Sequence, residues 1–186
     1  MRVIAGKYRS RGLSSLPGTD IRPTSDRLRE TLFNVLTAGN PAALEGTTWL
    51  DLFAGTGAVG IEAISRGAAM VRFVESSAAA AGVIRKNLKS LGIESGYELL
   101  QRDVTQELDH LAGADFVFID PPYRLEAAYG QALTAVSDKA VGLVIAEHQK
   151  RFDPGDEFGR LQRYRTLKQG DAALSFYRVA IQGMSA

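Results

Sequence analysis

The chain has 186 residues, which is enough for one well-buried domain and too few for two large ones. Its net charge is +1, and it contains no cysteine and two histidines, so disulfides are excluded and no metal site is expected. No apolar run reaches the length of a membrane span and no signal peptide pattern is visible, so we expect a cytoplasmic protein that contacts no membrane.

The first forty residues are more basic than the chain as a whole. They contain seven Lys or Arg residues against three acids, and no acid precedes Asp20. This local excess of positive charge indicates a polyanionic partner. Residues 1–16 are expected to form a short strand pair or an extended arm, in which Tyr8 could stack on a base while neighbouring cations meet phosphates. A solvated basic edge that discourages aggregation explains these residues equally well.

A helix is predicted after the break at Arg22-Pro-Thr, from residue 24 to about residue 36, because apolar side chains recur on one face. Arg27 and Arg29 would project from other faces and extend the basic surface. A Gly-Asn-Pro stretch ends the helix, and a linker follows. We therefore expect a basic N-terminal part, residues 1–40, and a core domain, residues 41–186.

From residue 47 the sequence alternates between strand and helix patterns, which is typical of a parallel sheet covered by helices. Strands are predicted at residues 48–52, 70–74, 97–101, 116–119 and 141–146. Helices are predicted at residues 58–66, from a cap at Ser76 or Ser77 to residue 91, and at about 125–136. An antiparallel pair is expected at about residues 161–167 and 173–181. The pattern predicts one α/β domain.

Three glycines directly follow the first predicted strand, at the start of the next helix. A strand that leads into such a turn forms a cradle for a nucleotide or nucleoside. The spacing also fits the dinucleotide pattern G-x-G-x-x-G, but Asp51 would repel a pyrophosphate about 4 Å away by roughly 4 kcal/mol. A cationic ligand fits better, and S-adenosylmethionine carries a sulfonium and an ammonium group. The pattern D-x-F-x-G-x-G at residues 51–57 resembles motif I of the Rossmann-like S-adenosylmethionine-dependent methyltransferases.

An acid lies at or just past the carboxyl end of each of four predicted strands: Asp51, Glu75, Asp103 and Asp120. In an open α/β sheet this edge binds ligands, although a single acid there is usually a helix cap. Glu75 is positioned to accept both ribose hydroxyls of the cofactor, Asp103 to accept from its adenine amino group and Asp51 to hold its methionine end. The predicted cofactor-binding residues are Asp51, Phe53, Gly55, Gly57, Glu75, Asp103 and Val104.

The predicted catalytic segment is Asp120-Pro121-Pro122-Tyr123, directly after the fourth strand. An exocyclic amine on a base is a poor nucleophile because its lone pair is delocalised into the ring. Asp120 and the Pro121 carbonyl could accept its two hydrogens and turn the lone pair toward an incoming methyl group. Two prolines would fix that carbonyl, and Tyr123 offers a face on which an extruded base can stack. A stiff turn with Asp120 capping the next helix is the purely structural alternative.

These four residues resemble the D/N-P-P-Y/F motif of methyltransferases that act on amino groups of adenine, cytosine, guanine or glutamine. Residues 2–13, 22–34 and 170–178 are in addition similar to the RsmD-type family, guanine-N2 methyltransferases of bacterial small-subunit ribosomal RNA. One departure is Glu75-Ser-Ser, where a second acid is expected shortly after the glutamate. The resemblance implies a mostly parallel, seven-stranded Rossmann-like methyltransferase sheet with an antiparallel C-terminal hairpin, helices on both faces, and S-adenosyl-L-methionine as cofactor.

The resemblance also implies 16S ribosomal RNA as partner, with the target guanine presented on an assembled small-subunit particle. The catalytic sheet leaves no room for a separate recognition domain, so we expect residues 1–40 to bind the RNA and the protein to act as a monomer. The candidate phosphate contacts are Lys7, Arg9, Arg11, Arg22 and Arg27.

Three other functions remain to be compared with this one. A DNA adenine-N6 or cytosine-N4 amino-methyltransferase would share the sheet and the motif, but the N-terminal stretch and the missing recognition domain argue against it. A non-catalytic RNA-binding factor is disfavoured by the intact Asp120 and glycine turn. An NAD-dependent dehydrogenase fits least, because Asp51 opposes a pyrophosphate, and His148 is interpreted as a polar residue at a strand end.

Overall fold

A computed structural model describes residues 1–16, 25–107, 113–139 and 141–180. The strands in these residues are β1 Thr48–Leu52, β2 Met70–Val74, β3 Tyr97–Leu100, β4 Ala114–Ile119, β5 Val141–Gln149, β6 Glu157–Phe158, β7 Leu161–Gln169 and β8 Ala172–Val179. The helices are α1 Asp26–Leu36, α2 Ala58–Ser65, α3 Ala78–Leu91, α4 Val104–Glu107 and α5 Glu126–Ser137.

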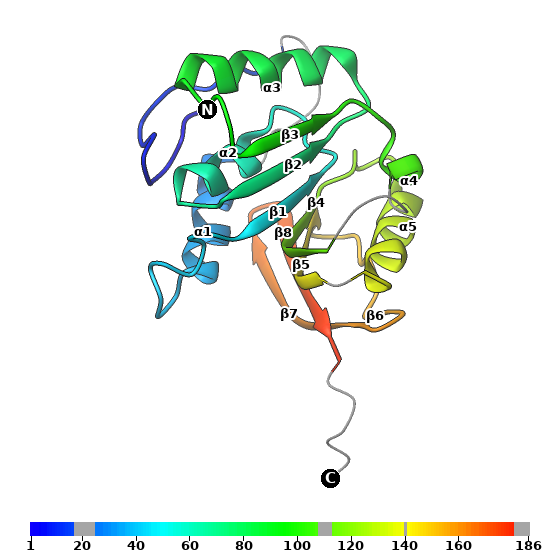
Figure 1. Ribbon diagram of the computed structural model, residues 1–186. Coiled ribbons are helices and arrows are strands. Elements are labelled where there is room, and N and C mark those ends of the chain that lie inside the picture. The colour runs from blue at the N-terminus through cyan, green and yellow to red at the C-terminus, as the bar shows by residue number, and fades with distance from the viewer. Residues whose placement is uncertain (17–24, 108–112, 140, 181–186) are drawn as a thin grey trace.

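The described strands form one sheet in the order β3-β2-β1-β4-β5-β8-β7-β6 (Figure 1). Strands β1 to β5 pair in parallel, and β8, β7 and β6 continue the sheet with antiparallel pairs. The predicted Rossmann-like sheet with an antiparallel C-terminal hairpin is therefore confirmed, and the two-residue strand β6 adds an eighth strand at its edge. None of the described helices is long and apolar enough to cross a membrane.

Helices cover both faces of the sheet (Figure 1). Alternate residues of each central strand point to opposite sides of the sheet. On one face, Trp49 of β1 stacks between Phe33 of α1 and Phe116 of β4, with ring centroids 5.5 and 4.7 Å apart. Helices α2 and α3 contribute to the same buried cluster. On the other face, Leu50 of β1 packs in a second cluster with α5 residues such as Leu133. Two-sided burial explains why the central strands are almost continuously apolar.

The helix boundaries follow from local capping. The Ser25 hydroxyl accepts a hydrogen bond from the backbone N–H of Leu28, so α1 begins at Asp26, while residue 24 lies outside the described residues. Ser77, one of the two predicted caps, accepts from the N–H of Ala80 at the start of α3. Gly92 ends α3 in the left-handed conformation, at the predicted stop.

Residues 1–16 fold back onto the domain. A single bridge joins Arg2 and Gly12, where a strand pair or an extended arm was expected. Val3 and Leu13 are buried in the same cluster as α1 and Trp49, so the N-terminal part shares its apolar core with the sheet. The division at residue 40 stays a prediction about function.

Strand β5 runs three residues past its predicted end because its pairing with β8 continues to Gln149 opposite Ala172. Glu147 and His148 thereby lie inside the sheet and are 3% and 2% exposed. His148 Nε2 lies 2.9 Å from the Ser175 hydroxyl, and burial lowers the pKa of this imidazole. His148 is therefore a buried residue at the carboxyl end of β5, as expected, although it lies within the strand and not past it.

Candidate active site

The turn after β1 is held in a conformation that glycine favours. Phe53, Gly55 and Gly57 have φ angles of +62°, +56° and +75°, and Gly57 is the N-cap of α2. The positive φ of Phe53 is strained, which is typical of positions beside a functional site. A Cβ atom at Gly60 would lie 2.3 Å from Cε1 of Phe73, so this glycine lets α2 lie directly against β2. The glycines thus bring the start of α2 to the carboxyl edge of the sheet.

Asp51 lies beneath this turn with 2% of its surface exposed. Its Oδ2 accepts a hydrogen bond from the backbone N–H of Gly60 at 2.9 Å. Burial raises the pKa of Asp51 from 3.8 to about 8, the Gly60 hydrogen bond lowers it, and the charge of Glu75 raises it. The carboxyl group therefore holds a proton at neutral pH, and a cation placed beside it would drive that proton off.

Glu75 joins the glycine turn to the start of α3. Its Oε2 accepts from the N–H of Gly55 at 2.8 Å and its Oε1 from the N–H of Ser77 at 2.7 Å. A carboxylate oxygen has two acceptor positions, so each oxygen can also accept from a ribose hydroxyl. The Glu75-Ser-Ser departure from the family pattern thus has a structural role, because Ser77 caps α3.

The chemistry of these groups fits S-adenosylmethionine better than a phosphate ligand. A helix N-terminus binds phosphate through free backbone N–H groups. Here the N–H groups of Gly60 and Gly55 already donate to Asp51 and Glu75. A sulfonium or ammonium group beside Asp51 would favour its ionised form, whereas a pyrophosphate would be repelled by the charge of Glu75.

Asp103 caps the short helix α4. Its Oδ1 accepts from the N–H and the hydroxyl of Thr105 at 2.8 and 2.6 Å, and these hydrogen bonds lower the pKa of the carboxyl group. Asp103 is exposed, whereas Val104 is 2% exposed and packs in the core. The contacts of Asp103 and Val104 with an adenine ring stay predictions.

The Asp120-Pro-Pro-Tyr segment lies beside the glycine turn. The backbone N–H of Asp120 donates to the carbonyl of Leu52 at 3.3 Å, one residue before the turn begins. Strands β4 and β1 are paired up to Ile119 opposite Leu52, so both segments leave the sheet at the same edge. The Pro122 carbonyl accepts a hydrogen bond from the N–H of Leu125 at 2.7 Å, which closes the turn after β4. The structure therefore brings the two predicted motifs together.

Tyr123, which is half-buried, lines a pocket of about 200 Å³. The other walls are Ser25, Arg27 and Leu28 at the start of α1, Glu147 of β5, and residues 169–172 of the turn between β7 and β8. Sequence reasoning missed Glu147, although the signal was present. This acid directly follows the predicted strand 141–146, in the position that Asp120 has after 116–119.

The predicted RNA-binding cations divide into two groups. Lys7, Arg9 and Arg11 are exposed on the N-terminal arm, which we define as residues 1–16. Arg27 is exposed on α1 and lines the Tyr123 pocket, while Arg22 lies outside the described residues. The structure thus places one predicted phosphate contact next to the catalytic segment.

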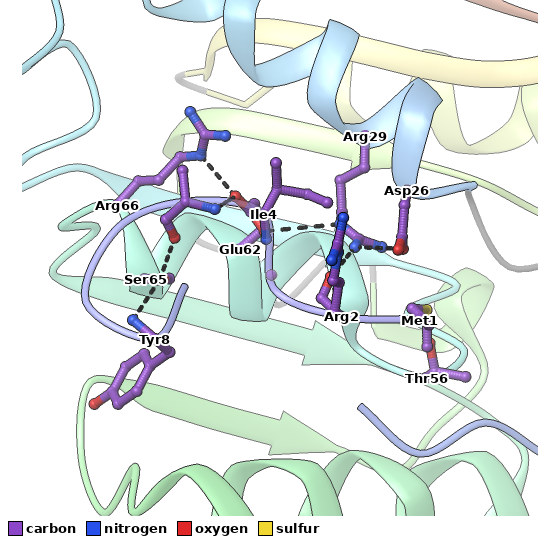
Figure 2. Close-up of polar contacts among 12 residues, drawn as sticks. Met1, Arg2, Ile4, Tyr8, Asp26, Arg29, Thr56, Glu62, Ser65 and Arg66 are labelled. Carbon is purple, nitrogen blue, oxygen red and sulfur yellow. Dashed lines mark hydrogen bonds and ion pairs between the residues drawn. The ribbon is translucent and has the colours of Figure 1, made fainter. Parts of the chain in front are cut away.

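Arg29 is not part of the basic surface, contrary to expectation. Its side chain is fully buried, with Nε 3.8 Å from Glu62 Oε2 of α2 and Nη2 2.9 Å from Asp26 Oδ1 (Figure 2). The same guanidinium donates to the carbonyl of Arg2. The periodicity of α1 placed Arg29 off the apolar stripe, but the folded arm covers that side of the helix. Arg29 therefore joins α1, α2 and the arm.

Glu62 is the centre of this buried network. Its two oxygens accept from the N–H groups of Ile4 and Ala5 at 2.8 and 3.0 Å, and Arg66 Nε donates to Oε1 at 2.8 Å (Figure 2). Asn87 of α3 makes a second attachment, because its Nδ2 donates to the carbonyls of Ser14 and Thr56, both at 3.1 Å. Thr56 belongs to the glycine turn, so the arm is fastened to the candidate cofactor site.

The fold and the site define a Rossmann-like S-adenosylmethionine-dependent methyltransferase. The structure is similar to that of the yhhF protein of Escherichia coli, with a TM-score of 0.81, 28% identity, and coverage of 98% of this chain and 99% of that one. It also shares the fold of the T. thermophilus 16S rRNA N2 methyltransferase RsmC, solved with AdoMet and guanosine. That likeness has a TM-score of 0.71 and 22% identity, over 89% of this chain and 46% of that one.

Sequence comparison identifies the family. The family model described as Conserved hypothetical protein 95 matches residues 1–178, and the chain belongs to this RsmD/YlbH family of methyltransferases. It is 32% identical over 186 residues to YlbH of Bacillus subtilis, covering 96% of this chain and 98% of that protein. It is 35% identical over 158 residues to Ribosomal RNA small subunit methyltransferase D of Haemophilus influenzae, covering 81% and 79%.

Proposed function

We propose that this protein methylates the exocyclic N2 amine of a guanine in 16S ribosomal RNA, as a cytoplasmic monomer acting on the small ribosomal subunit or its precursor. The observation that carries the proposal is the hydrogen bond from Asp120 N–H to the Leu52 carbonyl, which puts the Asp-Pro-Pro-Tyr segment beside the glycine turn. The Haemophilus influenzae relative is, by its name, a methyltransferase of small-subunit ribosomal RNA, which supports an RNA substrate of that kind.

The turn after β1 and the acids around it would hold the cofactor. Asp51 and the backbone at Gly55 and Gly57 would hold its methionine end, and Glu75 its ribose. Asp103 and the N–H of Val104 would contact its adenine. S-adenosylmethionine supplies a methyl group that its sulfonium has already activated, so most of the remaining work is positioning.

Asp120 and Pro121 would prepare the acceptor amine. The Asp120 carboxylate and the Pro121 carbonyl each accept one hydrogen of the N2 amine, so its lone pair turns toward the methyl group. Pro121 is buried and its ring restricts the backbone, which keeps that carbonyl in place. Tyr123 would stack on the extruded guanine, with Pro122 rigidifying the turn before it.

The arm cations and Arg27 would bind the RNA backbone. Lys7, Arg9 and Arg11 are exposed on a segment that is fastened to α2 and α3, so their positions are fixed relative to the glycine turn. A fixed array of cations orients a polyanion at little entropic cost. Residues 1–40, including Arg22, would thus act as the RNA-binding part.

The test is transfer of a labelled methyl group to three substrates: small-subunit particles that lack the modification, naked 16S rRNA and duplex DNA. We expect transfer to the RNA of the particles, and nucleoside mass spectrometry should identify the product as N2-methylguanosine. Transfer to adenine or cytosine of DNA would instead establish the amino-methyltransferase alternative. Absence of both transfer and S-adenosylmethionine binding would support a non-catalytic RNA-binding factor.

A further inference from the structure

Asp120 and Glu147 occupy equivalent positions on neighbouring parallel strands. The register of β4 and β5 pairs Ile119 with Ala146, so the next residues, Asp120 and Glu147, stand side by side at the carboxyl edge. Adjacent strands lie about 4.8 Å apart. Ile119 and Ala146 both pack on the α5 face, so by alternation the two acids belong to the face covered by α1.

Glu147 lines the pocket that Tyr123 also lines, and only 3% of its surface is exposed. Its main chain is held in place by Tyr129, whose hydroxyl donates to the Glu147 carbonyl at 2.8 Å. Burial raises the pKa of Tyr129, and the charges of Asp120, Tyr123 and Glu147 add to this rise. The phenol thus stays a hydrogen-bond donor, and β5 presents Glu147 from a fixed backbone.

A second acceptor-bearing side chain, Gln169, borders the same pocket. The amide oxygen Oε1 of Gln169 is buried and, among the described residues, has no hydrogen-bond partner. Gln169 lines the pocket at the turn between β7 and β8. A buried polar atom without a partner costs roughly 1–3 kcal/mol, a cost that a ligand donor would remove. Two acceptor-bearing side chains, Glu147 and Gln169, therefore border the pocket that Tyr123 lines.

Bases with an exocyclic amine differ at the ring nitrogen beside it. In guanine the neighbour of the N2 amine on the Watson–Crick edge is N1–H, a donor. In adenine and cytosine the corresponding nitrogens, N1 and N3, carry a lone pair. An ionised carboxylate only accepts hydrogen bonds, so it can bind N1–H of guanine. It would be repelled by the ring lone pairs of adenine and cytosine. Asp120, the neighbour of Glu147, would accept a hydrogen bond from the amine itself.

We propose that Glu147 is the specificity-determining residue of this site and accepts the N1–H of the target guanine. The inference rests on the proposed function, because it takes the base held by Asp120 and Tyr123 to be the methyl acceptor. It also places Arg27 at the rim of the pocket, where its guanidinium can donate to N7, an acceptor that guanine and 2-aminopurine share.

The experiment compares two target bases and two variants. Once the modified guanosine is mapped, particles are reconstituted with 16S rRNA that carries guanine or 2-aminopurine at that position. 2-Aminopurine keeps the 2-amine and N7, but it lacks O6 and has a lone pair at N1. The wild-type protein should prefer guanine in kcat/KM by about tenfold or more, which is the usual discrimination from one good polar contact to a base.

Glu147→Gln should lower kcat/KM on guanine by about tenfold and bring the ratio of the two bases close to one, because the amide can donate to a ring lone pair. Glu157→Gln, an exposed acid on β6, is the matched control and should preserve the wild-type preference. Binding of S-adenosylhomocysteine, measured by calorimetry, should be the same in all three proteins.

The outcomes separate the inference from the proposed function. A wild-type protein that methylates no guanine overturns the proposed function. A wild-type protein that methylates guanine and 2-aminopurine equally well overturns the role of Glu147 alone, and so does a Glu147→Gln variant that keeps the full guanine preference. If Glu147→Gln fails to fold, the wild-type comparison of the two bases decides.

Discussion

Arg29 and Glu62 form an ion pair in which neither side chain is exposed, with Arg29 Nε 3.8 Å from Glu62 Oε2. The pair stands where the arm, α1 and α2 meet, and Glu62 also holds two backbone N–H groups of the arm. Removing one partner of a buried pair leaves an uncompensated charge, which is far more costly than the pair itself is stabilising. The attachment of the arm can therefore be measured through the stability of variants that break this ion pair.

Glu62→Gln should lower the free energy of unfolding by about 3 kcal/mol, because Arg29 loses its buried anionic partner and keeps the partly exposed Asp26. Urea unfolding measures this change. The matched control is Glu98→Gln, which breaks the Arg72–Glu98 pair, where the Glu98 side chain is 51% exposed. Glu98→Gln should lower the free energy of unfolding by less than about 1 kcal/mol. Equal losses in the two variants would contradict the buried network.

Gly60→Ala should destabilise the protein by about 1–3 kcal/mol, because its Cβ would lie 2.3 Å from Cε1 of Phe73. Gly82→Ala is the matched control, since Gly82 lies within α3 and a Cβ there meets no atom within 4 Å. The control should stabilise the protein by about 0.5–1 kcal/mol through helix propensity. Thermal denaturation measures both, and the close packing of α2 on β2 would be refuted by shifts of the same sign.

The pKa of Asp51 makes stability depend on pH. Burial raises this pKa from 3.8 to about 8, so between these pH values the folded state keeps a proton that the unfolded state has lost. The contribution of Asp51 to the free energy of unfolding therefore falls as the pH rises through this window. Asp51→Asn should remove that decline, as seen in urea unfolding at pH 5, 6, 7 and 8. A decline of equal size in both proteins would assign it to other groups.

Glu75→Ala should weaken S-adenosylmethionine binding by about tenfold or more, because it removes the side-chain acceptor for the ribose hydroxyls. Isothermal titration calorimetry measures the affinity. Glu94→Ala, an exposed acid beyond α3, should bind as the wild type does. Unchanged affinity in Glu75→Ala would remove Glu75 from the cofactor site.

Asp120→Ala should abolish methyl transfer while S-adenosylmethionine binding survives, because the carboxylate acts on the acceptor amine and not on the cofactor. Asp120→Asn keeps one acceptor oxygen and should retain part of the activity. Single-turnover transfer assays and calorimetry measure the two effects. Full turnover in Asp120→Ala would rule out its role in orienting the amine.

Local sequence patterns predicted much of the sheet. The strands β1 and β2 agree with the apolar runs to the residue, because strands buried on both faces read as short apolar segments with clear ends. The turn glycines and the Ser77 cap were predicted equally well, since each depends on the conformation of a few neighbouring residues. The ends of β4 and β5 were less accurate, because pairing partners extend those strands.

The sequence by itself determined the sheet, the glycine turn and the two motifs, because periodicity and turn chemistry act over a few neighbouring residues. Only the tertiary structure decided that Arg29 is buried against Glu62, that Arg27 and Gln169 border the Tyr123 pocket, and that Glu147 stands beside Asp120. These relationships join residues far apart in the chain. Their distances follow from strand order and helix packing, which no local pattern encodes.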